Sequence, residues 1–405
     1  MSNNYKKQID EEFSKGKDLS VVNLVNSLIG HGHSLRASDI HMDAKSKALN
    51  VRFRIDGVMK DIMSIPKEIE SEVISRIKIL SHLRTDEHQM TQDGRFRIAF
   101  DNPGVIDVRV AVSPAYYGES IILRLLADKE SEFNLSNLGF SQENQDKLLA
   151  AINKPYGMIL ATGPTGSGKT TTLYTVLKIL NTSDVSIITI EDPIEYAIDN
   201  IRQIPVNHRT GLTFNAGLKS ILRQDPDIIM VGEIRDEDTA GLAINSALTG
   251  HLLLSTLHTN DAATTLPRLL DMKVEPYLIS STVNVAIGQR LVRKICESCK
   301  EEKPLSGSEI KSITTGGIKI PGGKKLFRGA GCDKCNQTGY KGRIGIYEVM
   351  PIESNIRQAI LKRESSEVIK KLAIKNGMTT IAEDGLAKVF AGVTTLEEIL
   401  RVIHE

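Results

Sequence analysis

The sequence has no tryptophan, almost no net charge and no long apolar run. Phe, Trp and Tyr make up 4% of its 405 residues, and the formal net charge is +1 at pH 7. Few aromatic side chains argue against a stacking surface for single-stranded nucleic acid. The balanced charge gives no general field that would attract nucleic acid or an anionic membrane. We therefore expect no nucleic-acid partner.

No segment contains eighteen uninterrupted apolar residues, so the sequence predicts no membrane-spanning helix. Residues 1–16 are polar and charged rather than arranged as a signal peptide. The sequence thus predicts a cytoplasmic protein that reaches a membrane only through partners. A hydrophobic fraction of 40% with 25% charged residues is typical of a globular protein, and this length suits two or three domains.

The first part of the chain has a small-scale alternation of helix and strand patterns. This alternation over residues 19–128 predicts a compact α+β domain, preceded by a polar tail over residues 1–18. Residues 129–136 are polar and aperiodic, and they predict a linker that serves as a hinge.

The rest of the chain, residues 137–405, predicts a larger α/β domain. Its apolar strands are continuous and bounded by helical patterns, which indicates a buried, mostly parallel sheet. Within this domain, residues 291–345 are rich in glycine and cysteine, and residues 346–405 have a helical pattern.

A phosphate-binding motif lies near the start of the larger domain. Residues 163–170 follow the pattern G-x-x-x-x-G-K-T, between an apolar strand at 158–162 and a helical pattern at 171–180. Backbone N–H groups and the helix N-terminus can hold phosphate oxygens, Lys169 can reach the β/γ-phosphates, and Thr170 can hold Mg²⁺. A glycine-rich structural turn is the alternative, but it would rarely fall between strand and helix. The expected ATP contacts are Gly163, Pro164, Thr165, Gly166, Ser167, Gly168, Lys169, Thr170 and Thr171.

Acidic residues end two further apolar strands. Glu191 and Asp192 could orient or deprotonate an attacking water, or they could cap the next turn. Glu233 follows the strand 228–231 and could bind Mg²⁺ or its waters. His258 comes after a third apolar strand, where it could hydrogen-bond the γ-phosphate or be a structural histidine.

Together these segments resemble the type II secretion and type IV pilus assembly ATPases. The segments that resemble the family's Walker A, Asp-box, Walker B and His-box motifs are 163–170, 190–195, 222–236 and 249–262. The resemblance continues in 37–41, 54–57, 92–95 and 377–379. It implies a RecA-like ATPase core after a smaller, PAS-like α+β domain. It also implies a hexamer that drives pilus or pseudopilus assembly through an inner-membrane platform protein, with Glu191 activating water.

Two other classes of function remain as alternatives. One is a pilus-retraction or DNA-processing motor of the same superfamily. The other is a nucleotide-gated scaffold that binds ATP with little turnover, which the set of Lys169, Glu191 and Glu233 disfavours.

Two arginines of the first domain match the positions of the family's arginine fingers. The resemblance implies that Arg109 and Arg124 meet the γ-phosphate when the first domain closes. The alternative is that they lie on an ordinary solvated strand face. Arg52, Arg54 and Arg95 are expected to be interface or structural residues.

The chain departs from the family pattern in two places. Many relatives begin with an additional domain, so docking to the platform through such a domain is not implied here. Residues 213–219 have no arginine where relatives often carry two. Asp39 and His41 lie in the segment 37–41, which resembles a family signature.

The four cysteines form two C-x-x-C pairs, Cys296/Cys299 and Cys332/Cys335, with 32 residues between the pairs. This pattern suits a structural Zn²⁺ site with four thiolate ligands, provided that residues 306–331 loop out. Disulfides are the alternative, which a cytoplasmic location disfavours. Assembly ATPases of the family carry such a tetracysteine element and retraction ATPases lack one, which favours an assembly role.

Overall fold

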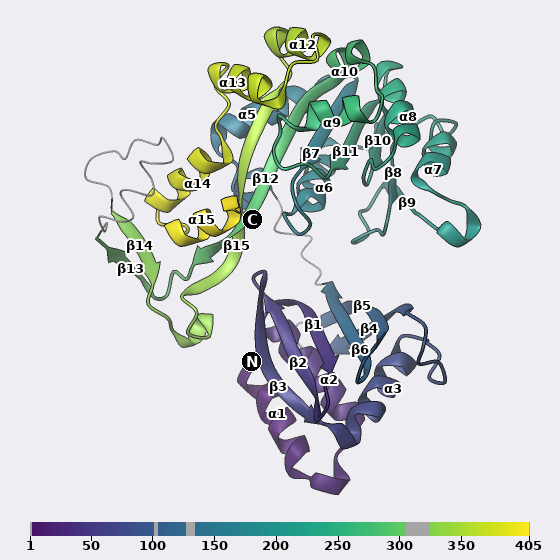
Figure 1. Ribbon diagram of the computed structural model, residues 1–405, viewed down its shortest axis with the longest axis vertical. Helices are drawn as coiled ribbons and strands as arrows, with labels where there is room; N and C mark the ends of the chain where they lie inside the picture. Colours follow the sequence, from purple (N-terminus) through teal and green to yellow (C-terminus); the bar gives the residue numbers. More distant parts are fainter. Residues whose placement is uncertain (1, 101–103, 127–133, 305–324, 405) are drawn as a thin grey trace. The chain divides into compact units, whose positions relative to one another are not determined.

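The computed structural model describes residues 2–100, 104–126, 134–304 and 325–404 (Figure 1). The chain forms two compact units, Met1–Lys129 and Glu130–Glu405. Most of the expected linker at 129–136 lies outside the described residues, as does most of the loop expected at 306–331.

The first unit is a six-stranded antiparallel sheet with helices packed on one face. In sheet order its strands are β3 (Val58–Pro66), β2 (Ala48–Ile55), β1 (Ala37–Ala44), β6 (Gly118–Leu126), β5 (Gly104–Ala115) and β4 (Gln92–Phe100). Its helices are α1 (Ser2–Ser14), η1 (Gly16–Asp18), α2 (Val21–Ser34), η2 (Lys67–Ile69) and α3 (Glu70–Leu80).

Alternation along the strands separates an apolar face from a charged one. On β1, Ile40 and Met42 are fully buried in the core that the helices cover. Asp39, His41 and Asp43 are the alternate residues of the strand and therefore point to the opposite face. The charged groups of this strand thus lie on the sheet face opposite the helices.

The first eighteen residues, expected to be a polar tail, contain a helix. Tyr5, Ile9 and Phe13 recur every four residues, so they share one face of α1. Ile9 is buried and Phe13 packs against the same core, while the ring of Tyr5 meets Phe100 edge-on. Helix α1 is therefore part of the hydrophobic core of the first unit, and its charged residues account for the polar character of the segment.

The second unit is an α/β fold around a seven-stranded sheet, which confirms the expected buried, mostly parallel sheet. In sheet order its strands are β15 (Tyr340–Pro351), β12 (Val283–Ile295), β7 (Gly157–Thr162), β11 (Leu252–Leu257), β10 (Ile228–Val231), β8 (Ile187–Glu191) and β9 (Ile201–Pro205). Neighbouring strands are parallel except for the pair β12 and β15.

Helices cover both faces of this sheet (Figure 1). One face packs against α7 (Phe214–Ile221), α8 (Glu237–Leu248), α9 (Thr265–Asp271), α10 (Pro276–Thr282), α12 (Ser354–Leu361) and α13 (Ser366–Lys375). The other packs against α4 (Leu135–Leu138), α5 (Gln142–Ile152) and α6 (Lys169–Leu180). Strand β7 contributes side chains to the hydrophobic cores on both faces of the sheet. Met158 and Leu160 face the first set of helices, and Ile159 and Ala161 face the second.

The cysteine-rich segment is an insertion between two strands of the main sheet. Residues 291 and 345, its expected limits, lie inside β12 and β15, which pair over most of their length. The insertion holds the small sheet β13 (Lys300–Lys303) with β14 (Leu326–Gly329), and η5 (Asp333–Cys335). Helices α14 (Ile381–Phe390) and α15 (Leu396–His404) form a separate core with this part of β12 and β15. The region 346–405, expected to be helical, therefore begins with the second half of β15.

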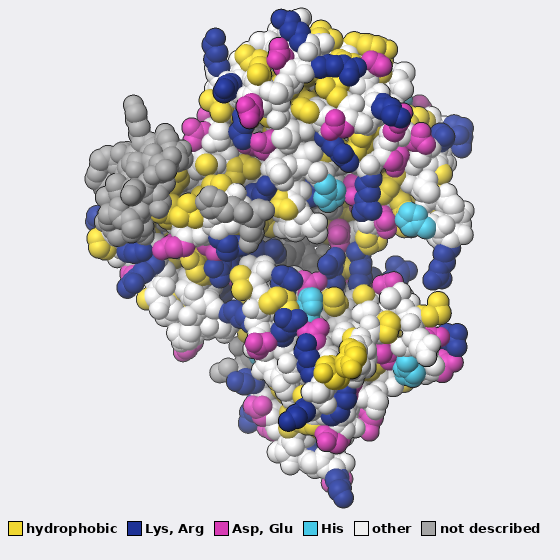
Figure 2. All heavy atoms as spheres, viewed as in Figure 1, with side chains coloured by type: hydrophobic (Ala, Val, Ile, Leu, Met, Phe, Trp, Pro, Cys, Tyr) yellow, Lys and Arg dark blue, Asp and Glu magenta, His cyan; other side chains and the backbone are white. Residues whose placement is uncertain are grey.

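None of the helices in the described part of the chain has both the length and the hydropathy that a membrane span requires. Within each unit, basic and acidic side chains are interspersed on the face drawn in Figure 2, in keeping with the net charge of +1.

Candidate nucleotide site and cysteine cluster

The glycine-rich loop joins β7 to α6 in a conformation that requires glycine. Gly163, Gly166 and Gly168 have φ values of 146°, 79° and 88°, which side chains rarely allow. A Cβ atom on Gly163 would also lie 2.5 Å from the carbonyl oxygen of Gln289 on β12. The loop therefore brings its backbone N–H groups together at the N-terminus of α6, an arrangement that can bind phosphate oxygens.

Lys169, the first residue of α6, is folded back over this loop. Its side chain is buried, and Nζ donates hydrogen bonds to the carbonyl oxygens of Gly163 and Pro164 at 2.8 and 3.1 Å. Burial lowers the pKa of Lys169; the charge of Glu233 opposes this shift and the charge of Arg290 adds to it. A buried ammonium group held by two loop carbonyls can exchange them for the oxygens of a bound phosphate.

Two residues of β12 contact the loop, and neither was expected from the sequence. Gln289 is fully buried, and its Nε2 donates to the carbonyl oxygen of Ser167 at 2.7 Å. Arg290 donates from Nη2 to the carbonyl oxygen of Asn260 at 2.8 Å, and a Cβ atom on Gly163 would lie 3.3 Å from its Nη1. No local motif marks these residues, because they reach the loop only through the pairing of β12 with β7.

The carboxylate of Glu233 links the end of β10 to the end of β11. Glu233 follows β10, and its Oε2 lies 2.6 Å from Nε of Arg235 and 3.2 Å from Nε2 of His258, which follows β11. Strands β10 and β11 are parallel neighbours, so both ends lie at the carboxyl edge of the sheet, where α/β folds bind ligands. Arg235 stands in the segment that resembles Walker B, yet no role was expected for it.

Glu191, at the end of β8, is more enclosed than a free general base. Its Oε1 accepts hydrogen bonds from Thr189 at 2.6 Å and Gln203 at 3.1 Å, and its Oε2 accepts one from the hydroxyl of Tyr174. Burial raises the pKa of Glu191 against the effect of these donors. A role in activating water would therefore require that Glu191 exchange one of these donors for the water.

Arg109 and Arg124 lie in the first unit, on neighbouring strands β5 and β6. They are directly opposite each other in the strand register. Arg124 has an exposed side chain whose Nε lies 3.0 Å from Oδ1 of Asp39, while Arg109 is half-buried.

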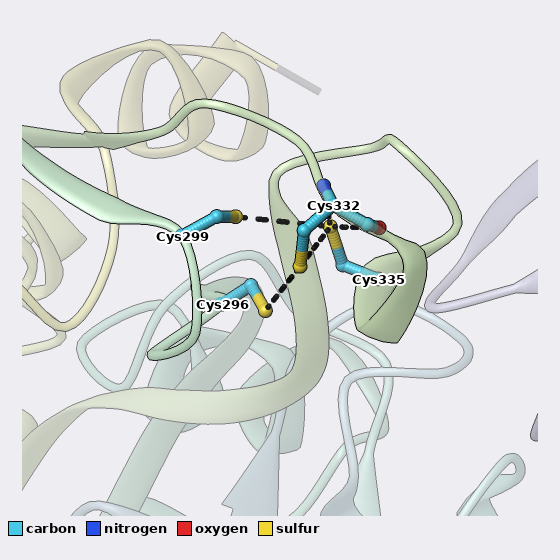
Figure 3. Close-up of side chains that lie close together, drawn as sticks. All are labelled: Cys296, Cys299, Cys332 and Cys335. Carbon is cyan, nitrogen blue, oxygen red and sulfur yellow. Dashed lines mark hydrogen bonds between the residues drawn. The ribbon is translucent and has the colours of Figure 1, made fainter.

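The four cysteines form one cluster (Figure 3). Cys296 and Cys299 follow β12, and Cys332 and Cys335 lie at η5; the side chains of the two pairs point toward one another. All four sulfur atoms lie within 4.8 Å of one another, and no disulfide joins them. The Sγ–Sγ distances are 3.9 Å for Cys296–Cys332, 3.8 Å for Cys299–Cys335 and 3.7 Å for Cys332–Cys335.

This cluster fits Zn²⁺ in both geometry and donor chemistry. A tetrahedral ion with Zn–S bonds of about 2.3 Å places its sulfur ligands about 3.8 Å apart. Although burial opposes ionisation of Cys335, backbone N–H groups of Cys332 and Gly339 lower its pKa to about 6. Burial and the neighbouring thiols together raise the pKa of Cys299 to about 12, against the effect of a backbone hydrogen bond from Gly331. A dication is the partner that would stabilise all four sulfurs as thiolates.

A buried parallel strand, a glycine loop ending in lysine and a helix define the second unit as the core of a P-loop ATPase. Comparison with known proteins then gives the family. Residues 14–401 match the family described as Type II/IV secretion system protein, and the chain belongs to this family.

The chain is similar to proteins of two related systems. It is 43% identical to the type IV pilus assembly ATPase PilB of Myxococcus xanthus, over 97% of this chain and 69% of that protein. It is 41% identical to the type II secretion system protein E of Aeromonas hydrophila, over 98% of this chain and 78% of the relative. Among solved structures, the pilus retraction motor PilT with bound ADP is similar at 26% identity and a TM-score of 0.63, over 92% of this chain and 95% of that one.

Proposed function

We propose that this ATPase is a hexameric motor that powers assembly of a type IV pilus or a type II secretion pseudopilus. The observation that carries the proposal is the arrangement of Lys169 beside a glycine loop, with Glu233 and His258 at the carboxyl edge of the same parallel sheet. This arrangement supplies a phosphate-binding loop, a carboxylate and a hydrogen-bonding imidazole at one site.

The roles of the residues around the nucleotide follow from their chemistry. The backbone N–H groups of residues 163–171, except Pro164, which has none, and the ammonium of Lys169 bind the phosphates of ATP. Thr170 and Glu233 would hold Mg²⁺, which neutralises charge on the β- and γ-phosphates when bound. His258, hydrogen-bonded to Glu233, is placed to respond when Glu233 changes its partners.

Three further residues complete the proposed hydrolytic site. Glu191 orients the attacking water, after giving up one of the hydrogen bonds described above. Arg109 and Arg124 approach the γ-phosphate when the first unit closes over the nucleotide, and their guanidinium groups stabilise the charge that develops there. Product release then reopens the site.

The two systems are inferred from relatives whose names state pilus assembly and type II secretion. We propose that six chains form a closed ring and that the ring acts on an inner-membrane platform protein from the cytoplasmic side. In this scheme the chain reaches the membrane through that partner. The four-cysteine cluster holds a structural Zn²⁺ and stabilises the insertion between β12 and β15.

A retraction motor is the second candidate, because PilT has a similar fold at 26% identity. Two observations favour assembly instead. The identity to assembly and secretion relatives is 41–43% over nearly the whole chain, and the chain contains the Cys₄ cluster.

A complementation experiment tests the proposal. Cells that lack this protein would receive the parent chain, Lys169→Ala, or the control Lys371→Ala, which changes an exposed lysine of α13. We expect filaments or secreted substrate with the parent and the control, and neither with Lys169→Ala. Cells without the protein that instead accumulate surface filaments would support the retraction motor and contradict the assembly role.

A further inference from the structure

A row of charged residues crosses the open face of the first unit's sheet at one register. Strand pairing places Arg95, Arg109, Arg124, Asp39 and Arg54 directly opposite one another in that order, on β4, β5, β6, β1 and β2. Like charges that face each other across neighbouring strands repel. The row contains four guanidinium groups and one carboxylate. The carboxylate is the single attractive partner in this row, so it sets the orientation of the arginines beside it.

Asp39 is buried, with 6% of its surface exposed, and both of its carboxylate oxygens have partners. Oδ1 accepts a hydrogen bond from Nε of Arg124 at 3.0 Å. Oδ2 accepts one from Oγ of Ser38 at 2.8 Å and lies 3.7 Å from Nε of Arg54. A carboxylate that has lost its hydration depends on such partners. Asp39 is therefore a fixed anchor rather than a mobile surface charge.

The anchor acts on one edge of the Arg124 guanidinium. Nε carries one of the five N–H donors of an arginine side chain, and the two Nη groups carry the other four. Asp39 binds Nε, while the Arg124 side chain as a whole remains 58% exposed. The contact therefore fixes the orientation of the guanidinium and leaves the fork of Nη donors at its outer edge, where a phosphate could bind it.

Arg54 holds the other side of the anchor. Its Nη1 donates to the carbonyl oxygen of Gly57, in the turn between β2 and β3, at 3.1 Å. Asp39 therefore lies between two arginines, Arg54 and Arg124. Its negative charge is divided between them, so it orients the Arg124 guanidinium but neutralises only part of that group's positive charge.

We propose that Asp39 is a positioning residue that pre-orients Arg124 for the γ-phosphate. The inference rests on the role of Arg124 proposed above. An arginine that is already oriented loses less side-chain freedom when it meets the phosphate. Misplacement of a reacting or stabilising group by about 1 Å can cost about 10²-fold in rate. Loss of the anchor therefore lowers turnover and leaves nucleotide binding by the second unit unchanged.

The test compares two aspartates of the same strand and face. Asp39→Asn removes the charge of the anchor with little change in shape. The matched control is Asp43→Asn, which removes the partner of Arg52, whose Nη2 lies 2.6 Å from Oδ2 of Asp43. Steady-state ATP turnover and the affinity for a fluorescent ATP analogue would be measured for both variants in the full chain. Each substitution would also be measured in an Arg124→Ala background.

We expect Asp39→Asn to lower kcat by about 10- to 100-fold. Its nucleotide affinity and its thermal midpoint should equal those of the Asp43→Asn control. In the Arg124→Ala background, Asp39→Asn should have no further effect, because the residue that it positions is gone. An equal loss of kcat in both backgrounds would mean a general structural role and would overturn the inference.

Two other outcomes separate this inference from the proposed function. Parent-like turnover of Asp39→Asn with slow Arg124→Ala would reject the role of Asp39 and keep that of Arg124. Parent-like turnover of Arg124→Ala would reject both. If Asp39→Asn does not fold, Asp39→Glu serves instead, since it keeps the charge but shifts the carboxylate. A parent-like kcat for a folded Asp39→Glu would then overturn the requirement for exact placement.

Discussion

Oε2 of Glu233 lies 3.2 Å from Nε2 of His258, which joins the ends of the neighbouring parallel strands β10 and β11. The same oxygen lies 2.6 Å from Nε of Arg235. One carboxylate oxygen thus holds two side chains, so a ligand that attracts Glu233 must weaken both contacts. The loops after β10 and β11 would then move together when the site fills or empties.

This relationship predicts that Glu233 matters for turnover rather than for binding. In Glu233→Gln we expect ATP affinity within about threefold of the parent and a kcat lower by about 10² or more, the range of a lost catalytic carboxylate. Glu237→Gln is the control, because Glu237 lies in α8 in an exposed ion pair with Lys273. Parent-like hydrolysis by Glu233→Gln would show that this carboxylate is not part of the hydrolytic site.

The contact of Gln289 with the glycine loop predicts a loss of nucleotide affinity in Gln289→Leu. The substitution introduces an apolar side chain of similar size and removes the donor to the Ser167 carbonyl oxygen. A buried hydrogen bond contributes about 1 kcal/mol, so we expect affinity to fall about fivefold. Asn284→Leu is the matched control, since Asn284 is a buried amide on the same strand that donates to the carbonyl oxygen of Tyr156. Equal affinities in the two variants would remove the support that we assign to Gln289.

The cysteine cluster predicts one tightly bound Zn²⁺ per chain, measured by elemental analysis of the purified protein. Cys335→Ser should lose the metal, and hydrogen exchange should increase in β13 and β14 because the insertion depends on the metal for its fold. Nucleotide affinity should stay near that of the parent. Protein without zinc, in which all four thiols react freely under native conditions, would exclude the site.

Much of the fold and part of the site could be predicted from the sequence. The strand–loop–helix order around Lys169 and the spacing of the cysteines are local patterns, and local patterns can be read without knowledge of tertiary contacts. The enclosure of Glu191 depends on Tyr174 and Gln203, which reach it from α6 and β9. No local pattern could show this, because the partners come together only when the sheet forms.

Other features do have a signal in the sequence. Tyr5, Ile9 and Phe13 have helical spacing, yet the charges around them suggested a polar tail. The expected limits of the cysteine-rich segment followed composition and so fell inside β12 and β15, whose apolar residues continue past them. The amino-acid composition changes at the point where the chain becomes more exposed to solvent. That point need not coincide with the end of a strand.

The stability of the C-terminal core should depend on pH through Glu398. Burial works against ionisation of Glu398, but hydrogen bonds from Arg293 and Arg401 lower its pKa to about 2. The unfolded group titrates near 4.5, so its stabilising contribution is fully present above that pH and is lost as the pH falls toward 2. A shift of this size corresponds to about 3 kcal/mol.

Glu398→Gln tests this dependence by thermal unfolding at several pH values. The midpoint should be lower than that of the parent at pH 7, and the difference should shrink between about pH 4.5 and pH 2. The control is Glu397→Gln, because Glu397 is largely exposed and lies 3.3 Å from Lys303. A difference between parent and Glu398→Gln that does not change with pH would contradict the assigned cause.

Hydrolysis in the proposed mechanism requires arginines from the first unit, and this requirement distinguishes a motor from a protein that only binds nucleotide. The decisive measurement is kcat together with nucleotide affinity in the double variant Arg109→Ala/Arg124→Ala. The control is Arg97→Ala, which removes an exposed arginine paired with Asp107 at 2.8 Å on the same sheet.

We expect the double variant to bind ATP within about threefold of the parent and to hydrolyse it slower by roughly 10³ to 10⁵, the range for a lost arginine finger. Arg97→Ala should keep the parent rate. Lysine at positions 109 and 124 should not restore activity, because an ammonium group lacks the planar fork of donors. Hydrolysis at the parent rate by the double alanine variant would contradict the proposed mechanism, even if its nucleotide affinity were unchanged.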